Sequence, residues 1–418
     1  MKILHITQGY YPAIGGTEWL VQRVSEELVR QFGDEVTVFT TNCYNGEGFF
    51  TPDSPRMPVG WDDINGVKVR RFPVSSRTSQ LLRFPQAVAY NLGLPGNQYL
   101  RAWASGPIIP GLMKAIQEYP VDIIMASSFP LLHMFSAQQA ARISKRPCVF
   151  SGGLHPLDTW GFQRPMIYRA IREATHYIAY TEFEAQYVIQ RGTPPERVSS
   201  IGVGVDVEPF ERVKKEDAKS RLGLVGKPVV GFVGQLGAFK GVDTLVKAMP
   251  IVWSVYPEVY LLIAGARTLF SDQLEKMVNQ LPETDRKKVI LRYNFSEEEK
   301  PWLFSAVDIF AYPSGYESFG IAFLEAWSCN NPVIGCRRGA IPWVVNAGRD
   351  GLLVEFRKEK MLAEAIILLL ENPAWAQSLG EAGHQKVLRR YTWPIIARRF
   401  RETYELSIDG SGANHLKN

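Results

Sequence analysis

The feature that most constrains this chain is a regular alternation of short apolar runs with longer amphipathic stretches. In the first half, the strand-like runs are "KILHIT", "EVTVFTT", "GVKVRRFPV", "VDIIMAS", "RPCVFSG" and "HYIAYT". Helical stretches such as "EWLVQRVSEELVRQF" and "LLHMFSAQQAARIS" lie between them. Strands that are separated by helices predict a parallel, doubly wound sheet.

The same pattern begins again after "SSIGVGVDVEPF", with "PVVGFVG", "VYLLIAG", "KVILRY", "VDIFAYP", "NPVIGC" and "GLLVEF" as strands. A chain of 418 residues is also too long for one ordinary hydrophobic core. We therefore predict an α/β protein with Rossmann-like domains at residues 1–205 and 206–390. Residues 391–418 are expected to form a helix that crosses back toward the first domain and ends in a disordered tail. The two domains are expected to face each other across a cleft, where open α/β sheets bind ligands.

Two glutamates stand eight positions apart in "SGYESFGIAFLEAWSCNNPVIG", residues 314–335. The stretch predicts a tight loop and then a helix, with Ser318 as its N-cap, Glu317 just ahead of it and Glu325 within it. Eight helical residues span about 12 Å, whereas a pair of carboxylates acting on one glycosidic bond needs about 5–9.5 Å. The spacing favours one long ligand held at both ends, with phosphate at the amides of the helix start. Two solvated glutamates on a surface helix remain the alternative.

Glycine-containing loops follow the first strand of each domain. In "GYYPAIGGTEWL", Gly15 and Gly16 allow close approach of a phosphate or sugar, and Thr17 could cap the next helix. In "GFVGQLGAFKGVDTLV", Lys240 is placed to neutralise a diphosphate. Neither loop is a GxGxxG or Walker A motif. An ordinary strand-to-helix turn and an exposed lysine are the alternatives.

His155 follows the strand in "VFSGGLHPLDTW". It lies at the carboxyl end of that strand, where it could bind a sugar hydroxyl group. A structural histidine is the alternative. The chain contains no GxSxG or HExxH motif and no DxD-like carboxylate pair, so we expect no metal site.

Cysteine content, hydropathy and charge bear on location and partners. The four cysteines have no metal-binding spacing, the N-terminus lacks the apolar core of a signal peptide, and no apolar run is long enough to span a membrane. We expect a soluble, cytoplasmic protein.

Residues 64–117 carry seven basic residues and no acidic one, interleaved with aromatic and aliphatic residues. This composition predicts contact with an anionic membrane, at the inner face of the plasma membrane, or a merely solvated surface; no nucleic-acid motif accompanies it.

Taken together, these motifs resemble the retaining nucleotide-sugar glycosyltransferases of family 4, which have the GT-B fold. The resemblance covers nearly the whole chain. It rests on "GGTE" (15–18), "SGGLHP" (151–156), "YTEFEAQYVIQRGTPPERVSSIGVGVD" (180–206), "FVGQLGAFKG" (232–241), "PSGYESFGIAFLEAWSCNNPVIG" (313–335) and "YTW" (391–393).

The resemblance implies a role for each matching residue. The implied catalytic residues are Glu317 at the donor sugar, His155 orienting that sugar and Lys240 on the diphosphate. The residues implied in donor binding are Gly16, Gln235, Lys240, Glu317, Ser318, Phe319, Gly320, Ile321 and Glu325, the last on the ribose. Gly15 and Gly16 are implied to line the acceptor side.

Two positions depart from the family pattern. Gln235 stands where the family usually has an arginine on the phosphates, and Trp343 replaces its usual glutamate. Arg267 could supply the missing positive charge. Backbone groups around residues 292–295 are the expected contacts of the nucleotide base.

The resulting hypothesis is a metal-independent, retaining, hexosyltransferase-like enzyme of polysaccharide biosynthesis. It would use a UDP-, GDP- or ADP-sugar as co-substrate, no other cofactor, and a glycan or lipid-linked acceptor. A GT-B nucleotide-sugar epimerase and a non-catalytic sugar-nucleotide-binding relative remain as alternatives; Gln235 motivates the second.

Overall fold

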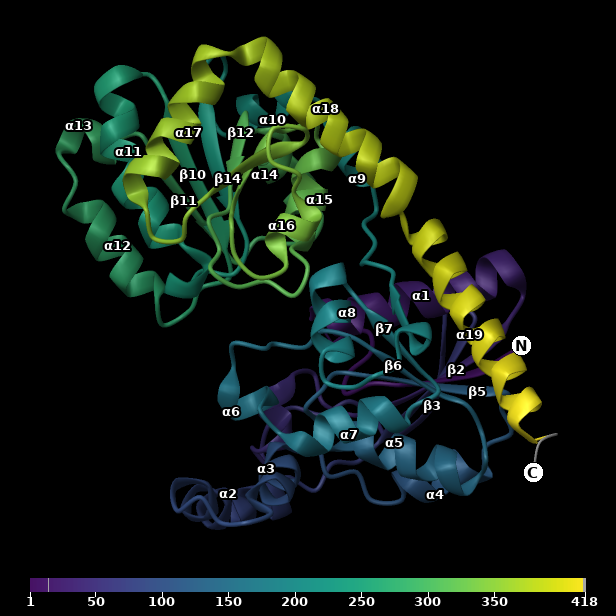
Figure 1. Cartoon of the computed structure of the whole chain (residues 1–418). Coiled ribbons are helices and arrows are strands. Elements are labelled where there is room, and N and C mark those ends of the chain that lie inside the picture. Colours follow the sequence, from purple (N-terminus) through teal and green to yellow (C-terminus); the bar gives the residue numbers. More distant parts are fainter. Residues whose placement is uncertain (14, 416–418) are drawn as a thin grey trace. The chain divides into compact units, whose positions relative to one another are not determined.

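The computed structural model describes residues 1–13 and 15–415, and side chains are described as far as residue 410. Contacts divide the chain into two compact units. Unit 1 comprises Met1–Val203 and Trp393–Asn418, and unit 2 comprises Gly204–Thr392. Each unit is an α/β sandwich built around one sheet (Figure 1).

The sheet of unit 1 has the strand order β3-β4-β2-β1-β5-β6-β7-β8, and every neighbouring pair is parallel except β3 and β4. Its strands are β1 Lys2–Ile6, β2 Glu35–Thr41, β3 Gly60–Ile64, β4 Val67–Phe72, β5 Ile123–Ser127, β6 Cys148–Ser151, β7 His176–Ala179 and β8 Val198–Ser200. The strands β5, β6 and β7 are buried at every position, which explains their continuous apolar sequences.

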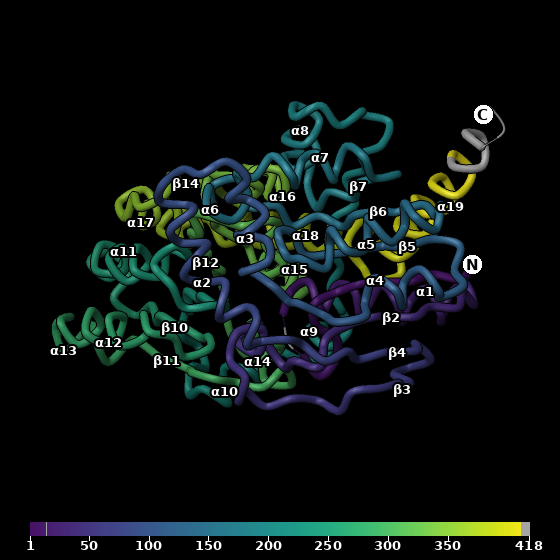
Figure 2. Tube along the Cα trace, turned by 90° about the horizontal axis from the view of Figure 1, so that it is seen from below, coloured from purple at the N-terminus to yellow at the C-terminus, as the bar shows by residue number. Residues whose placement is uncertain are grey.

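Helices cover both faces of this sheet. They are α1 Gly16–Phe32, η1 Gly46–Phe49, α2 Ser76–Asn91, α3 Asn97–Ser105, α4 Leu112–Glu118, α5 Leu132–Ile143, α6 Thr159–Phe162, α7 Pro165–Glu173, α8 Glu182–Ile189, η2 Pro195–Arg197 and α19 Trp393–His415. The first and last helices, α1 and α19, pack side by side on one face (Figure 1 and Figure 2). Helices α4 and α5 pack together, with α5 against β1, β5 and β6.

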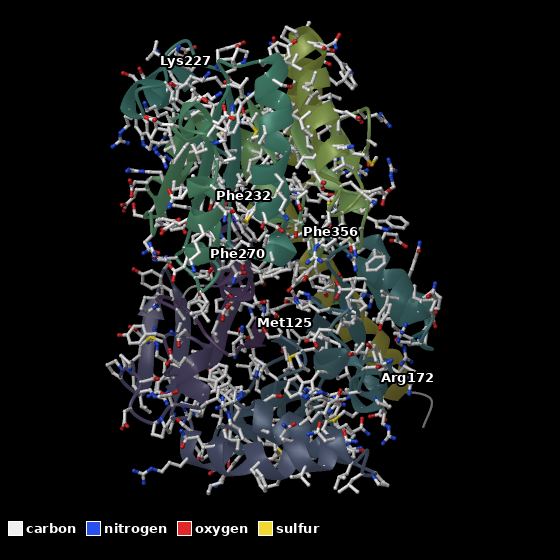
Figure 3. All side chains as sticks on the ribbon, turned by 90° about the vertical axis from the view of Figure 1, so that its left-hand side faces the viewer. Met125, Arg172, Lys227, Phe232, Phe270 and Phe356 are labelled. Atoms are coloured by element: carbon white, nitrogen blue, oxygen red, sulfur yellow. The ribbon has the colours of Figure 1, made fainter. Side chains whose placement is uncertain are left out.

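Unit 2 has a fully parallel sheet with the order β11-β10-β9-β12-β13-β14. Its strands are β9 Val229–Val233, β10 Tyr260–Gly265, β11 Val289–Tyr293, β12 Ile309–Ala311, β13 Val333–Cys336 and β14 Gly351–Val354. Phe232 of β9 lies among these strands (Figure 3), and its ring stacks on Tyr312 with centroids 4.9 Å apart.

The helices of unit 2 are α9 Glu208–Glu211, α10 Lys215–Arg221, η3 Ala238–Lys240, α11 Val242–Val255, α12 Ser271–Asn279, α13 Glu283–Arg286, α14 Lys300–Ser305, α15 Ile321–Ser328, α16 Ile341–Val344, α17 Glu359–Glu371 and α18 Pro373–Arg390. Helices α11 and α12 flank the sheet on one side, and α14 and α15 flank it on the other (Figure 1). This arrangement is the doubly wound topology that the alternation of strands and helices predicted.

The end of the chain differs from the sequence-based expectation. Helix α19 continues to His415, so the disordered tail is wrong as far as that residue; residues 416–418 lie outside the described residues. Once a helix is established, each added residue contributes one more hydrogen bond without a new nucleation cost, which lets it run into a polar sequence. The described helices include none long and apolar enough to cross a membrane.

Candidate active site

The candidate site of unit 2 lies where the strand order reverses direction, between β9 and its neighbour β12. The chain leaves β9 into the loop that carries Lys240 and leaves β12 into the loop that carries Glu317. In open parallel sheets, this reversal point separates the two loops and creates the usual ligand position. The predicted glutamate and lysine are therefore brought together by topology.

Lys240 and Glu317 form a short ion pair. Lys240 Nζ donates to Glu317 Oε1 over 2.6 Å, and the two side chains are only 13% and 11% exposed. The supporting loops are also joined by their backbones, because Gly315 N donates to the carbonyl oxygen of Phe239 over 2.8 Å. The two joined loops therefore hold a cation and a carboxylate in direct contact.

Gly241 makes this close approach of the loops possible. Its φ of 75° lies in the left-handed region, and it separates η3 from α11. A Cβ at this position would lie 2.1 Å from the carbonyl oxygen of Pro313. Both the backbone conformation and the available space therefore require glycine here.

Tyr312 is buried and lies next to Glu317. Burial raises the pKa of its phenol well above the usual value, and the Glu317 carboxylate, to which it hydrogen-bonds, raises it further. A phenol that stays protonated donates to this carboxylate and limits its orientation. The sequence analysis did not identify Tyr312, because the residue stood only at the end of a predicted apolar strand.

The start of α15 corrects one prediction. Ser318 does not cap this helix, since the N-cap is Gly320, at φ 98°. The chain needs the left-handed conformation at residue 320 to turn into the helix, and the helix consequently begins later, at Ile321. The first N–H groups of a helix have no partner within it and attract anions. The helix that carries them begins at Ile321, shortly after Glu317 in the sequence. At the other end, Asn330 adopts a left-handed conformation, with φ 57°.

Glu325 lies within α15 and has a lysine partner of its own. Lys300 Nζ, at the start of α14, donates to Glu325 Oε1 over 3.1 Å and also pairs with Glu297 over 2.7 Å. Burial raises the pKa of Glu325, and Lys300 opposes this shift. Burial alone lowers the pKa of Lys300, but Glu325 and Glu297 outweigh it, and the net shift is upward. Sequence analysis missed Lys300, which lies in the charged run "SEEEK".

The positions that depart from the family pattern are all at the surface. Gln235 is exposed in the loop after β9, and Trp343 is exposed in α16. Arg267 forms ion pairs with Asp272 and Glu275 of α12. Its charge is already balanced by two carboxylates, which argues against Arg267 as a replacement for the missing arginine.

In unit 1, Gly15 and Gly16 occupy the start of α1, after β1. Gly15 is the N-cap and no side chain caps the helix, so the expected role of Thr17 as a cap is wrong, because the helix already begins at Gly16. A Cβ on Gly15 would lie 2.2 Å from Glu18 Oε2, whereas a Cβ on Gly16 would meet nothing within 4 Å. The space beside Gly16 is open.

His155 lies in the loop that follows β6 and packs its ring edge on Phe162, with centroids 5.4 Å apart. A buried carboxylate, Glu184 of α8, holds this loop. Glu184 Oε1 accepts hydrogen bonds from the amides of Gly153 and Leu154 at 2.8 and 2.7 Å. Burial raises the pKa of Glu184, and these bonds oppose the shift. The anchor fixes the backbone immediately before His155.

Within residues 1–13 and 15–410, no group of three or more histidine, cysteine, aspartate or glutamate side chains is arranged to hold a metal ion.

Comparison with known families identifies the class. Residues 15–204 match the family described as "Glycosyl transferase 4-like domain", and residues 214–386 match "Glycosyl transferases group 1". The two matches together account for most of the chain, which therefore belongs to glycosyltransferase family 4. Its two Rossmann-like units have the GT-B fold.

Two curated relatives illustrate the range of the similarity. The chain is 32% identical to the alpha-maltose-1-phosphate synthase of Mycolicibacterium smegmatis over 223 residues, which are 50% of this chain and 57% of the relative. It is 27% identical, over 305 residues, to a GDP-mannose-dependent monoacylated alpha-(1-6)-phosphatidylinositol monomannoside mannosyltransferase of Corynebacterium glutamicum; 69% of this chain and 77% of that protein are covered. The chain spans little more than half the length of the first curated relatives that it matches.

Solved structures agree with the fold. The chain is similar to Anabaena HepE in complex with UDP, with a TM-score of 0.73, 20% identity, and 97% of this chain and 100% of that chain covered. It is also similar to the sucrose-phosphate synthase of Thermosynechococcus elongatus, with a TM-score of 0.72, 20% identity, and coverage of 98% and 100%. At 20% identity, this similarity is evidence for the fold alone.

Proposed function

We propose that this protein is a retaining glycosyltransferase that moves a sugar from a nucleotide diphosphate sugar to a glycan or lipid-linked acceptor. The observation that carries the proposal is the Lys240–Glu317 pair at the reversal point of the unit 2 sheet. A nucleotide sugar presents an anionic diphosphate next to sugar hydroxyl groups. It needs a cation and a hydrogen-bond acceptor side by side, and the pair supplies both.

The proposed donor lies along the start of α15. Lys240 binds the diphosphate, the amides of residues 318–321 complete the phosphate and sugar contacts, and Glu325 accepts hydrogen bonds from the ribose. The mostly buried Glu325 side chain is consistent with an enclosed hydroxyl partner. Backbone groups of residues 292–295 are proposed for the base. HepE has been crystallised with UDP and UDP-glucose, and the corynebacterial relative is named for GDP-mannose. We keep UDP, GDP and ADP as candidate nucleotides.

In the proposed reaction, the bond between the anomeric carbon and the diphosphate oxygen breaks while the acceptor oxygen bonds to the same face of that carbon. The acceptor hydroxyl proton passes to the departing diphosphate. Lys240 and the helix amides stabilise the charge that grows on this leaving group. Glu317 holds the sugar hydroxyl groups near the reacting carbon. The side chains and amides of the chain thus provide the charge stabilisation, and we propose no metal and no further cofactor.

We assign Gly15, Gly16 and His155 of unit 1 to the acceptor side and to the orientation of the sugar. The open space beside Gly16 allows a ligand to approach the backbone. The amide anchor provided by Glu184 supports His155, because it fixes the loop that presents this side chain.

We also propose peripheral contact with an anionic membrane through α2 and α3. Residues 64–117 contain no acidic residue, and Leu81 and Phe84 of α2 are both 77% exposed. Exposed apolar side chains with surrounding arginines are typical of helices that lie at a lipid surface.

The decisive experiment is Glu317→Ala, assayed with a donor selected by a thermal-shift screen of nucleotide sugars. We expect kcat to fall by about 100-fold or more, the range for removing one group that stabilises a transition state. Glu371→Ala, an exposed acid at the end of α17, is the matched control and should leave kcat unchanged. An unchanged transfer rate in a folded Glu317→Ala protein would refute the assigned role.

The same assay tests the other parts of the proposal. The anomeric configuration of the product, followed by NMR during the reaction, should match that of the donor, and a chelator should not reduce the rate. A product formed from the donor alone would indicate an epimerase. Calorimetric binding of the donor without turnover would indicate a non-catalytic relative, and Gln235→Arg should then tighten binding.

A further inference from the structure

Two arginines are buried in unit 1, and neither has an acidic partner among the described residues. Arg101 of α3 is 4% exposed, and Arg164, which immediately precedes α7, is 0% exposed. Within the described part of the chain, neither guanidinium group forms an ion pair with a carboxylate; the nearby Asp158 acts on both only at longer range. Buried charges of this kind normally have an ionic partner.

The hydrogen bonds of the two guanidinium groups are incomplete. Arg101 Nη1 donates to the carbonyl oxygen of Trp160 over 2.8 Å, and Arg164 Nε donates to the same oxygen over 3.3 Å. Arg164 Nη2 reaches Ser105 Oγ over 3.5 Å. Arg101 Nε and Arg164 Nη1 are buried and have no partner in the part of the chain that the structure describes. Gln86 Oε1 is likewise buried, with no partner among the described side chains and backbone groups.

The electrostatic balance of this region is positive. Burial and, to a smaller extent, the charge of Arg101 lower the pKa of Arg164, while Asp158 opposes both effects, and the net pKa is about 10. Asp158 already accepts a hydrogen bond from the amide of Gly161 over 2.9 Å and caps α6. Two like charges are held in a poorly hydrated place, which is unfavourable unless an anion joins them.

A pocket of about 490 Å³ adjoins the pair. Its wall includes Ser105 and Trp160, which contact Arg164, and Gln86. Arg83, an exposed residue of α2, lines the same pocket and lies over the Phe50 ring at 4.8 Å. Asp158 also lines the pocket, whereas Arg101 and Arg164 are bonded to the lining residues Trp160 and Ser105 without being in the lining themselves. The three arginines outnumber this carboxylate, so the surroundings of the pocket are positive, and its volume is within the range for small organic ligands. Figure 1 shows α2 and α3, which build this side of unit 1.

We propose that this pocket, with Arg83 in its wall and Arg101 and Arg164 directly behind Ser105 and Trp160, binds the phosphate group of a phosphate ester. Planar guanidinium groups bind phosphate through paired hydrogen bonds, and a dianion compensates two buried positive charges. Assigning this ester to the acceptor rests on the proposed function, whereas the phosphate site itself does not. Leu81 and Phe84, exposed on the helix that carries Arg83, are suited to an apolar chain on the same molecule.

Calorimetry with glycerol 3-phosphate, on the full chain, tests the phosphate site. We expect binding to the unmodified protein and at least 10-fold weaker binding to Arg101→Gln and Arg164→Gln. Arg172→Gln, an arginine of α7 that donates to the carbonyl oxygen of Arg191 at the surface, is the matched control and should bind as the unmodified protein does. Equal affinity in all four proteins, or no binding to any of them, would overturn the proposal.

Because Arg101 and Arg164 are buried, their variants could fail to fold. Thermal unfolding identifies that case, and Arg83→Gln then decides, since its side chain is exposed. It should weaken glycerol 3-phosphate binding severalfold without changing the unfolding temperature. An unchanged affinity in folded Arg83→Gln, together with no loss in any folded variant of the buried pair, would overturn the proposal.

Vesicles distinguish the two sources of the phosphate. Arginine-dependent binding to phosphatidylcholine vesicles with phosphatidic acid, but not to phosphatidylcholine alone, would assign a lipid phosphate; binding of glycerol 3-phosphate only would assign a soluble ester. Transfer kinetics then separate this inference from the proposed function. If no nucleotide sugar supports transfer but phosphate binding still needs the arginines, the function fails and the site stands. If transfer to a phosphorylated acceptor proceeds with the same KM in Arg164→Gln, the assignment of the ester to the acceptor fails and the function stands.

Discussion

Glu184 of unit 1 and the two largely buried glutamates of the unit 2 site are held in different ways. In unit 1, Glu184 accepts hydrogen bonds from the amides of Gly153, Leu154 and Tyr180 and from the Tyr177 hydroxyl, at 2.7–2.8 Å. In unit 2, Glu317 and Glu325 each accept a hydrogen bond from a lysine. The first carboxylate is a fixed part of the backbone structure. The other two are held by side chains that can turn.

This difference separates a structural acid from two functional candidates. An amide cannot leave Glu184 without moving a strand or loop, so no ligand can replace it. A lysine is a flexible point charge with three donors. Lys240 can keep its hydrogen bond to Glu317 and still donate to a diphosphate. Burial of an acidic residue therefore does not identify a site by itself, and the nature of its partner does.

Acidification should produce the largest difference between the units. Three buried histidines of unit 1 have a lowered pKa: burial lowers the pKa of His5 to about 3 and those of His133 and His176 to about 4. The unfolded chain binds these protons at about pH 6.5, so stability is present above that pH and is lost as the pH falls toward 4. At pH 5 the loss is about 2 kcal/mol for each histidine, or about 6 kcal/mol in all.

Hydrogen exchange at pH 7 and pH 5, read by segment, measures this effect. Protection should fall first in β1, α5 and β7, which carry these histidines. Loss of protection in unit 2 before unit 1 would contradict the prediction.

Glu184→Ala should have the next largest effect. It leaves three amides and a tyrosine hydroxyl group without their acceptor in a buried place. We expect the free energy of unfolding of unit 1 to fall by about 3–5 kcal/mol. Denaturant unfolding measures this change. The control is Glu182→Ala, an exposed acid of the same helix, which should change stability by less than about 0.5 kcal/mol. Similar losses in both variants would remove the distinction between the glutamates.

Gly241→Ala compares the glycine loops of the two units. The left-handed backbone and the clash with Pro313 together should cost about 2–4 kcal/mol in unit 2. Gly16→Ala adds a methyl group in open space and should change the stability of unit 1 by less than about 1 kcal/mol. If Gly16 lines the ligand, this variant should still lose transfer activity. Thermal unfolding and transfer assays on both variants measure these effects, and an unstable Gly16→Ala would argue for a structural role.

Glu317→Gln should have the smallest effect on stability. The amide oxygen still accepts a hydrogen bond from Lys240, so unfolding of unit 2 should change by about 1 kcal/mol or less. Denaturant unfolding of the purified variant gives this value. A loss as large as that of Glu184→Ala would mean that Glu317, too, is primarily structural.

The fold was accessible to sequence analysis because its central strands are buried on both faces and are therefore continuously apolar. The exceptions have physical reasons. The edge strand β3 has the polar sequence "GWDDI", and β8 has only three residues. Neither presents an apolar run, and both were missed.

The site was accessible in part. Lys240 and Glu317 could be predicted because each follows a strand whose carboxyl end lies at the reversal point of the sheet. Lys300 could not, because its partner is 25 positions away and the contact depends on how α14 packs near α15. Ser318 was expected to cap the helix, but a glycine two residues later determines where it begins. The unpaired state of Arg101 and Arg164 is a property of tertiary packing and has no sequence signal.

The division of the chain has a consequence for its synthesis on the ribosome. Unit 1 is interrupted after Val203 and resumes only at Trp393. His5 Nε2 lies 3.0 Å from the Tyr404 hydroxyl group. This partner is translated almost four hundred codons after His5. The nascent first unit must remain incomplete while the whole of the second emerges, which gives the second unit the earlier opportunity to complete its core.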